Sequence, residues 1–102
     1  MYKLKYSEEA ENDLTDIFNY IANDSRDRAI KYLGEIEKSI LQLESFPEIG
    51  HVAGYPELAS LGIRILGHDD YLIFYIINKE EQEVRIHRVL RGSMNYVHLF
   101  KK

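Results

Sequence analysis

The sequence of 102 residues contains no cysteine. This absence excludes a disulfide-stabilised scaffold, a thiol nucleophile and a metal site built on thiolates, and it fits the reducing cytoplasm. Long hydrophobic runs are also absent: no stretch approaches the roughly 20 apolar residues of a bilayer-spanning helix. Residues 1–6 alternate between polar and apolar side chains instead of forming the core of a signal peptide. We therefore expect a soluble, cytoplasmic protein with no membrane partner.

Motifs for metal, phosphate or serine chemistry are missing as well. The four histidines (His51, His68, His87 and His98) form no pair at helical spacing, and His68-Asp69-Asp70 lies where a hairpin turn is expected. No glycine-rich loop precedes a predicted helix, and Ser93 lacks the flanking glycines of a nucleophile elbow. We therefore expect no metal site, no cofactor and no hydrolase triad.

The chain is long enough for one hydrophobic core and one modest site. A domain of this length buries roughly two-thirds of the surface of its unfolded chain. Hydrophobic residues make up 45% of the sequence, which predicts a folded chain. No internal repeat, low-complexity tract or linker divides it, so we expect a single domain over residues 1–102.

Two amphipathic helices are predicted in the first half, after a strand over residues 2–6. Ser7 offers an N-cap hydroxyl, and acidic residues follow in the first turns, where the helix dipole favours anions. Asp24 and Asp27 resemble a capping box for the second helix. The apolar stripes comprise Ala10, Leu14, Ile17, Phe18 and Ile21 in the first helix, and Ala29, Leu33, Ile36, Ile40 and Leu43 in the second. The second stripe has a period near 3.5 residues, which predicts an antiparallel helical hairpin.

Three further strands are predicted after a long loop between Phe46 and Leu61. They cover residues 62–66, 71–77 and 83–91, and the middle one is an unbroken apolar run, typical of a central strand covered on both faces. In the last strand we expect Val84, Ile86 and Leu90 on one face, and Arg85, His87, Val89 and Arg91 on the other. The order β-α-α-β-β-β predicts an α+β fold: a helical hairpin packed on one face of a small, mostly antiparallel twisted sheet, with the other face partly open.

The charge is distributed unevenly along the chain. Residues 1–50 hold six Lys/Arg and eleven Asp/Glu, whereas residues 84–102 hold five Lys/Arg, including Lys101 and Lys102, and no acid. A polyanion or an acidic partner peptide would find a favourable field only at this C-terminal segment. A solvated strand face followed by a charged C-terminus is the simpler explanation.

The segment from Arg88 to His98 has the residue types for metal-free RNA cleavage. That chemistry needs a base for the 2′-hydroxyl, cations that stabilise the phosphorane and an aromatic platform. Arg88 and Arg91 could supply charge, Tyr96 stacking or proton transfer, and His98 acid chemistry. Tyrosine has a reference pKa of roughly 10, so Tyr96 would need neighbouring cations to act as a base. In the alternative, Tyr96 and Phe100 pack the tail onto the sheet and the arginines pair with helix acids.

Arg88 interrupts an otherwise apolar strand face. Burial of an unpaired guanidinium costs several kcal/mol. We therefore expect Arg88 to find a carboxylate, to reach a cleft or to be turned outward by a β-bulge.

Five segments together resemble the RelE/ParE superfamily of bacterial type II toxins, nearer its ParE-like (plasmid-stabilisation) branch. Residues 2–14 are similar to the opening strand and first helix of the family, with its Ser-x-x-Ala-x-x-Asp-Leu pattern, and residues 17–21 continue that helix. Residues 43–50 resemble its Leu-x-x-x-Pro-x-x-Gly junction. Residues 71–75 and 86–93 resemble its central and last strands.

The resemblance implies a small toxin that a cognate antitoxin holds inactive. In the ParE-like branch the toxin poisons DNA gyrase by protein contacts, without catalysis. In the RelE-like branch it is a ribosome-dependent mRNA endoribonuclease. Ribonuclease members are usually strongly basic and carry a basic residue near Leu72, whereas this chain has a net charge of −4. These differences favour the ParE-like function, with a decayed, non-toxic homologue as the remaining alternative.

The resemblance also suggests which residues serve each function. An antitoxin with an acidic, partly disordered segment would bind Leu14, Phe18, Leu33, Ile36 and Arg85. The target, gyrase or alternatively the ribosome, would contact Arg85, Arg88, Arg91, Tyr96, His98 and Phe100. A ribonuclease would use Arg64, Arg91 and Tyr96 for catalysis. We expect no sequence-specific DNA binding by the chain alone.

Overall fold

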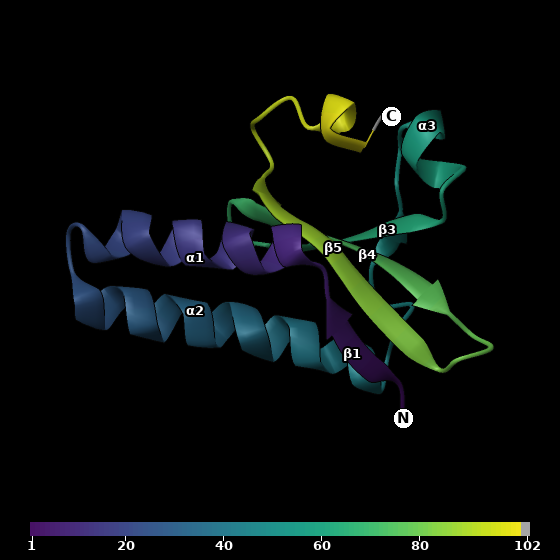
Figure 1. Ribbon diagram of the computed structural model, residues 1–102, viewed down its shortest axis with the longest axis horizontal. Helices are drawn as coiled ribbons and strands as arrows, with labels where there is room; N and C mark the ends of the chain where they lie inside the picture. Colours follow the sequence, from purple (N-terminus) through teal and green to yellow (C-terminus); the bar gives the residue numbers. More distant parts are fainter. Residues whose placement is uncertain (101–102) are drawn as a thin grey trace.

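The computed structural model describes residues 1–100, which form two long helices, one short helix and a five-stranded sheet (Figure 1). The helices are α1 (Glu8–Ala22), α2 (Arg26–Leu41) and α3 (Pro56–Ala59). The strands are β1 (Lys3–Tyr6), β2 (His51–Val52), β3 (Ile63–His68), β4 (Tyr71–Asn78) and β5 (Glu83–Arg91). The 3-10 turns η1 (Gln42–Glu44) and η2 (Val97–Phe100) follow α2 and β5. Within residues 1–100, no helix combines the length and apolarity needed to cross a bilayer.

Both long helices begin at a serine N-cap and form the predicted antiparallel hairpin (Figure 1). Each hydroxyl accepts a hydrogen bond from the amide three residues later, at 3.0 Å for Ser7 and 3.2 Å for Ser25. The predicted cap at Asp24 is wrong, because the Ser25 hydroxyl is the group that accepts from the first turn of the helix, at the Arg28 amide. The second helix therefore begins one residue later than its acidic residues indicated.

The sheet has the strand order β1-β5-β4-β3-β2 and is antiparallel except for the parallel pair of β1 and β5. The α+β class and the mostly antiparallel sheet are therefore confirmed. The predicted loop between Phe46 and Leu61 contains two elements that the sequence did not indicate. They are α3 and β2, which pairs with β3 where His51 lies opposite Ile65. Two residues are too few for side-chain alternation to reveal a strand.

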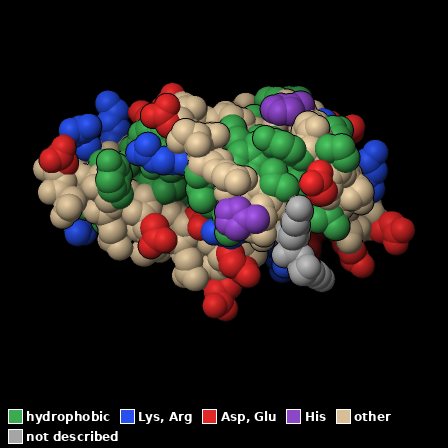
Figure 2. Space-filling model, turned by 90° about the horizontal axis from the view of Figure 1, so that it is seen from above, with side chains coloured by type: hydrophobic (Ala, Val, Ile, Leu, Met, Phe, Trp, Pro, Cys, Tyr) green, Lys and Arg blue, Asp and Glu red, His purple; other side chains and the backbone are tan. Residues whose placement is uncertain are grey.

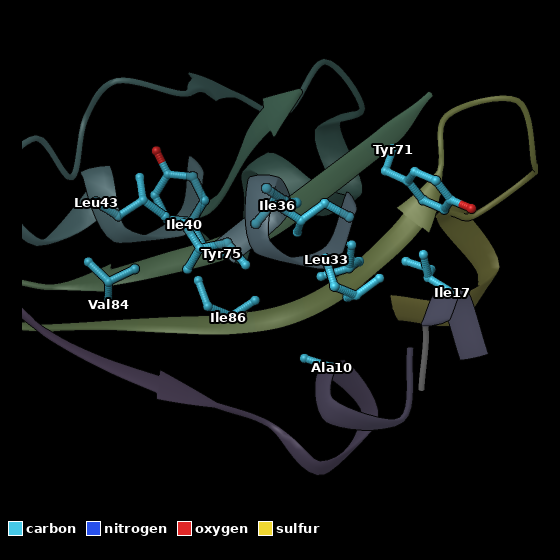
Figure 3. Close-up of a cluster of buried hydrophobic side chains, with 12 residues drawn as sticks. Ala10, Ile17, Leu33, Ile36, Ile40, Leu43, Tyr71, Tyr75, Val84 and Ile86 are labelled. Carbon is cyan, nitrogen blue, oxygen red and sulfur yellow. The ribbon is translucent and has the colours of Figure 1, made fainter. Parts of the chain in front are cut away.

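The helical hairpin covers one face of the sheet and encloses the larger cluster of buried side chains. Figure 3 shows Ala10 and Ile17 of α1, together with side chains of α2, facing Tyr75 of β4 and side chains of β5. Phe74 lies beside Tyr75 in β4 but packs on the opposite face of the sheet, and both side chains are fully buried. β4 is thus the central strand covered on both faces, as its apolar run predicts.

The second face of the sheet is covered by α3 and by the C-terminal segment. Phe74 packs there in a cluster with Leu58 of α3, and the rings of Tyr96 and Phe100 lie over it. This face is consequently less open than the sequence predicts. Figure 1 shows η2 and α3 on the same side of the sheet, away from the hairpin.

A β-bulge interrupts β5. Tyr75 pairs with Ile86, whereas its neighbour Phe74 pairs with Arg88, so His87 is an extra residue on β5. A bulge of this kind shifts the alternation of side chains by one residue. Before His87, even-numbered residues of β5 lie on the hairpin face of the sheet, whereas after it odd-numbered residues do.

The bulge changes which side chains of β5 share a face. Val84 and Ile86 lie in the cluster beneath the hairpin, and Val89 joins them there. Leu90 packs on the opposite face, and Arg91 lies on the hairpin side, near the end of α1. The predicted grouping of Val84, Ile86 and Leu90 is therefore wrong, because strict alternation along a strand holds only without a bulge.

β1 ends at Tyr6, and beyond this point side chains of Ser7 and α1 bind the backbone at the edge of β5. The Ser7 hydroxyl donates to the carbonyl of His87 at 2.7 Å, and the Asp13 carboxylate accepts from the amide of Val89 at 2.9 Å. Backbone groups of β5 that lack a strand partner thus bind side chains of the helix.

Asp13 also forms a bidentate ion pair with Arg88. The distances are 2.8 Å from Nε to Oδ2 and 2.9 Å from the terminal nitrogen to Oδ1. The hydrogen bond with Asp13 raises the pKa of Arg88 above its ordinary value. Arg88 therefore finds a carboxylate partner, which is one of the three outcomes expected for it, and it does so next to a β-bulge.

A second set of hydrogen bonds fastens residues 47–50 to the sheet. The Tyr75 hydroxyl donates to the carbonyl of Pro47 at 2.7 Å and accepts from the amide of Gly50 at 3.0 Å. The Arg64 guanidinium donates to the carbonyls of Gly50 at 2.6 Å and Glu48 at 3.0 Å. The loop before β2 is therefore held by side chains of β3 and β4.

We predict that Asp13→Ala lowers the free energy of unfolding by about 2–4 kcal/mol, because it leaves the Arg88 guanidinium and the Val89 amide without partners. Urea unfolding followed by circular dichroism measures this loss. Asp16→Ala removes an exposed carboxylate from the same helix and should change stability by less than about 0.5 kcal/mol. Equal midpoints for the two variants would contradict the role of Asp13.

Gly50→Ala should destabilise the fold by about 3 kcal/mol. A Cβ atom at Gly50 would lie 2.6 Å from both the carbonyl oxygen of Ile65 and the Tyr75 hydroxyl. Gly54 offers a matched control, since a Cβ there meets nothing within 4 Å. Thermal unfolding of both variants tests this prediction, and a Gly50→Ala variant as stable as Gly54→Ala would refute it.

Candidate functional site: a cleft at the hairpin tip and a patch over the tail

The three arginines of β5 differ in how far a partner molecule can reach them. Arg88 is held by its ion pair, and 22% of its side chain is exposed. Arg85 is 51% exposed and lies 3.5 Å from the carboxylate of Glu83. Arg91 is exposed, and no carboxylate among residues 1–100 lies within ion-pair distance of it. Arg85 and Arg91 thus reach the surface, whereas Arg88 serves the fold.

Arg91 lies in a cleft between the tip of the helical hairpin and the turn that joins β3 to β4. We call this hollow the tip cleft; its volume is about 810 Å³. It is lined by Tyr20, Ile21, Arg28, Lys31, Tyr32, Glu35, Asp69, Asp70, Tyr71 and Arg91. The Arg91 guanidinium lies 5.6 Å from the ring centroid of Tyr20 and 5.8 Å from that of Tyr71, within cation–π range.

Aromatic contacts continue from Tyr71 across the tip cleft. Tyr32 of α2 lies 6.1 Å from Tyr71 and 5.8 Å from His68, measured between ring centroids. Burial, and then the negative charge of Asp69, raise the pKa of Tyr32 to about 12. The Tyr32 hydroxyl therefore stays protonated at physiological pH and is a donor for the neighbouring carboxylate.

The tail after β5 packs on the opposite face of the sheet. The ring centroid of Tyr96 lies 4.9 Å from that of Phe74 and 5.9 Å from that of Tyr55, and Phe100 lies 5.2 Å from Phe74. The predicted packing of Tyr96 and Phe100 onto the sheet is therefore observed, while His98 is exposed. Lys101 and Lys102 lie outside the described residues.

Apolar side chains gather on the surface around the tail and α3, as Figure 2 shows. We call the exposed members of this group the tail patch: Tyr55, Leu61, Met94 and Leu99. Each is between 38% and 52% exposed. Exposed apolar side chains that gather on one surface mark interaction sites on soluble proteins.

The three candidate catalytic residues do not converge. Tyr96 lies on the face of the sheet that carries the tail, whereas Arg91 lies on the hairpin face. Arg64 pairs in register with Tyr75, and Arg91 with Tyr71. Since a strand rises roughly 3.3 Å per residue, the two arginines are on the order of 13 Å apart along β4. Arg64 is also occupied by the backbone carbonyls that it binds.

The pKa of Tyr96 is shifted in the wrong direction for a base. Burial, and then the neighbouring Tyr55, raise the pKa of Tyr96 above its ordinary value. No cation contacts its ring among residues 1–100. Tyr96 therefore lacks the cationic neighbours that proton abstraction would require.

The helix residues predicted to bind the antitoxin divide between surface and core. Leu14 and Phe18 are half-buried and pack against the edge of the larger cluster. Leu33 is 9% exposed and Ile36 is fully buried, so neither offers a surface to a partner. The apolar stripe of α2 is directed entirely into the core.

The four histidines belong to different elements: His51 to β2, His68 to β3, His87 to β5 and His98 to η2. Nδ1 of His68 lies 2.7 Å from the Ser39 hydroxyl. Burial, and then Arg85, lower the pKa of His87, so this side chain is neutral at physiological pH. Among residues 1–100, no three His, Asp or Glu side chains are grouped so that they could hold a metal ion.

Three tyrosines of the tip cleft were not among the predicted site residues. Tyr20 and Tyr32 sit on helices where aromatic residues usually belong to the core, and Tyr71 begins a buried strand. The one signal in the sequence is composition, since eight tyrosines accompany no tryptophan. Tyrosine with arginine is typical of interaction surfaces.

Solved structures share this fold. The chain is similar to the chromosomal ParDE toxin–antitoxin system from P. aeruginosa, at 21% identity and a TM-score of 0.66, over 89% of this chain and 96% of the other. The RelBE2 toxin–antitoxin complex from Mycobacterium tuberculosis matches at 22% identity and a TM-score of 0.66, over 88% and 96%. The intact E. coli RelBE toxin–antitoxin complex matches at 15% identity and a TM-score of 0.65, over 92% and 100%.

A family model gives the stronger assignment. No curated protein matches the chain. The model described as the ParE toxin of the type II toxin-antitoxin system parDE matches residues 4–96, from β1 through the ring that packs on Phe74. Because this match spans most of the chain, the protein belongs to the ParE toxin family of type II toxin-antitoxin systems, within the RelE/ParE superfamily.

Proposed function

We propose that this chain is a toxin that inhibits a DNA topoisomerase, DNA gyrase in the first instance, by protein contacts and without catalysis of its own. We further propose that a cognate antitoxin neutralises it. Membership of the ParE toxin family supports the toxin role. The similar structures from P. aeruginosa, M. tuberculosis and E. coli, which are described as toxin–antitoxin systems or complexes, support the antitoxin partner.

The main support for inhibition by contact is the separation of Arg64, Arg91 and Tyr96. Metal-independent cleavage of RNA requires a base and at least one cation within hydrogen-bond reach of the same phosphate. Here the tyrosine and Arg91 lie on opposite faces of one sheet, and Arg64 is bound to backbone carbonyls. The raised pKa of Tyr96 adds to this argument.

The tail patch is the surface that we propose for the target. It is apolar and exposed, and His98 lies on the same short segment. Tyr96 and Phe100 hold that segment on Phe74, so the patch is presented by a packed structure. Interfaces of this kind need an apolar centre with a polar rim.

Induction of the chain alone should arrest growth with a DNA damage response, while protein synthesis continues at first. In vitro, the purified chain should abolish supercoiling by DNA gyrase. Undisturbed supercoiling at excess toxin would remove the gyrase proposal. Cleavage of mRNA in a translating extract would replace it with the ribonuclease. A harmless chain that still binds the antitoxin would indicate a decayed toxin.

Met94→Glu and Leu99→Glu should each raise the concentration of toxin needed for half-inhibition of gyrase roughly tenfold or more, because a carboxylate would be desolvated in an apolar contact. Both side chains are exposed, so the fold should be retained, as circular dichroism will check. Lys79→Glu changes an exposed side chain in the β4–β5 turn and is the matched control. Inhibition by both patch variants at the wild-type concentration would exclude the tail patch as the target surface.

A further inference from the structure

We infer that the tip cleft is the docking site for a mixed-charge segment of the antitoxin, which places a carboxylate on Arg91 between the rings of Tyr20 and Tyr71. This inference rests on the proposed function for the existence of the antitoxin. It differs from the expectation of an acidic segment bound at Leu14, Phe18, Leu33, Ile36 and Arg85. It also assigns docking roles to two tyrosines that the sequence did not single out.

Arg91 is the arginine of β5 that is most available to donate hydrogen bonds to a partner's carboxylate. Arg88 is neutralised by Asp13, and Arg85 has Glu83 beside it, whereas Arg91 has no acidic partner among residues 1–100. The rings of Tyr20 and Tyr71 flank the exposed Arg91 guanidinium at cation–π distance. A carboxylate that binds between these rings displaces water from the guanidinium, and this desolvation strengthens the charge-assisted hydrogen bond that forms.

The acidic residues of the tip cleft require that the partner segment carry cations as well as a carboxylate. Arg28, Lys31 and Arg91 are matched by Glu35, Asp69 and Asp70. A segment with acidic side chains alone would meet the Asp69–Asp70 turn as a like charge. A segment that carries Lys or Arg near its carboxylate complements both sets, and like-charge contacts exclude other partners.

The same balance of charge favours a polypeptide over a nucleic acid. A polyanion gains affinity by binding a surface that is cationic throughout, because its condensed counterions are then released into solution. Three carboxylates among ten lining residues oppose a phosphate backbone. Tyrosine and arginine, in contrast, are the side chains that carry most of the binding energy in protein interfaces.

Isothermal titration calorimetry tests the inference with the full-length toxin. The probe is the protein encoded by the reading frame adjacent to the gene of this chain, provided that it rescues growth. Arg91→Ala and Tyr20→Ala should each weaken binding roughly tenfold to a hundredfold. Asp70→Lys should also weaken it, whereas a purely acidic segment would bind that variant more tightly.

Lys79→Ala is the control, since it removes an exposed cation that does not line the tip cleft and should change affinity less than about twofold. Unchanged affinity in both Arg91→Ala and Tyr20→Ala would overturn the inference while leaving the antitoxin, and so the proposed function, intact. Tighter binding of Asp70→Lys would overturn the mixed-charge assignment. A single-stranded RNA that binds the wild type and is lost in Arg91→Ala, with antitoxin affinity unchanged, would make the cleft a nucleic-acid site instead.

The proposed function fails by a different result: a wild-type chain that neither arrests growth nor binds the adjacent gene product. Both Arg91 and Tyr20 are exposed, so their variants should fold, and thermal unfolding will verify this.

Amide chemical-shift changes on adding antitoxin to the wild type locate the contact independently of any substitution. They should be largest around residues 20–35 and 69–71, and changes confined to the tail patch would overturn the inference.

Discussion

The carboxylate of Asp13 joins the helical hairpin to the last strand, just beyond the point where the pairing of β1 with β5 ends. It accepts hydrogen bonds from the Val89 amide and from two nitrogens of the Arg88 guanidinium. These bonds take the place of the strand pairing that would otherwise continue β1 along β5. The contact sits directly after the bulge at His87, which inverts the alternation of the strand. That inversion brings Arg91 to the hairpin side and to Tyr20. The tip cleft therefore depends on the same local geometry that neutralises Arg88.

Local patterns in the sequence were sufficient for the elements and the fold class. Serine caps, apolar stripes and an unbroken apolar run each report on neighbours within a few residues, and the two long helices and the three long strands of the second half follow from them. The need of Arg88 for a carboxylate was also predictable. The identity of that carboxylate was not predictable, because Asp13 lies 75 residues away from Arg88 and is one of several acidic residues in the first half of α1. The bulge and the two-residue strand β2 leave no periodic signal.

The candidate site was predictable in residue type but not in arrangement. The positive C-terminal segment suggested one cationic surface, with arginines, Tyr96 and His98 together. A single extra residue in β5 and a tail folded over Phe74 divide that set between two faces of the sheet. Residues close in sequence can lie on opposite faces of a sheet. Closeness along β5 and the tail therefore did not indicate which of these side chains lie together on one surface. The tyrosines of the tip cleft come from three separate elements and meet only in the folded chain.

The two proposed surfaces on opposite faces set a requirement on the antitoxin. A segment anchored in the tip cleft does not itself cover the tail patch, since the sheet lies between them. Arg91 of the tip cleft and Met94 of the tail patch are three residues apart in the chain, so their Cα atoms are at most about 11 Å apart, a distance that three to four extended residues span. A flexible segment can therefore dock its charged part at Arg91 and lay an apolar continuation on the tail patch. In that arrangement the cleft supplies partner specificity through charge, and the patch supplies competition with the target. Neutralisation then needs both parts on one chain, because the second contact gains from the effective concentration that the first creates.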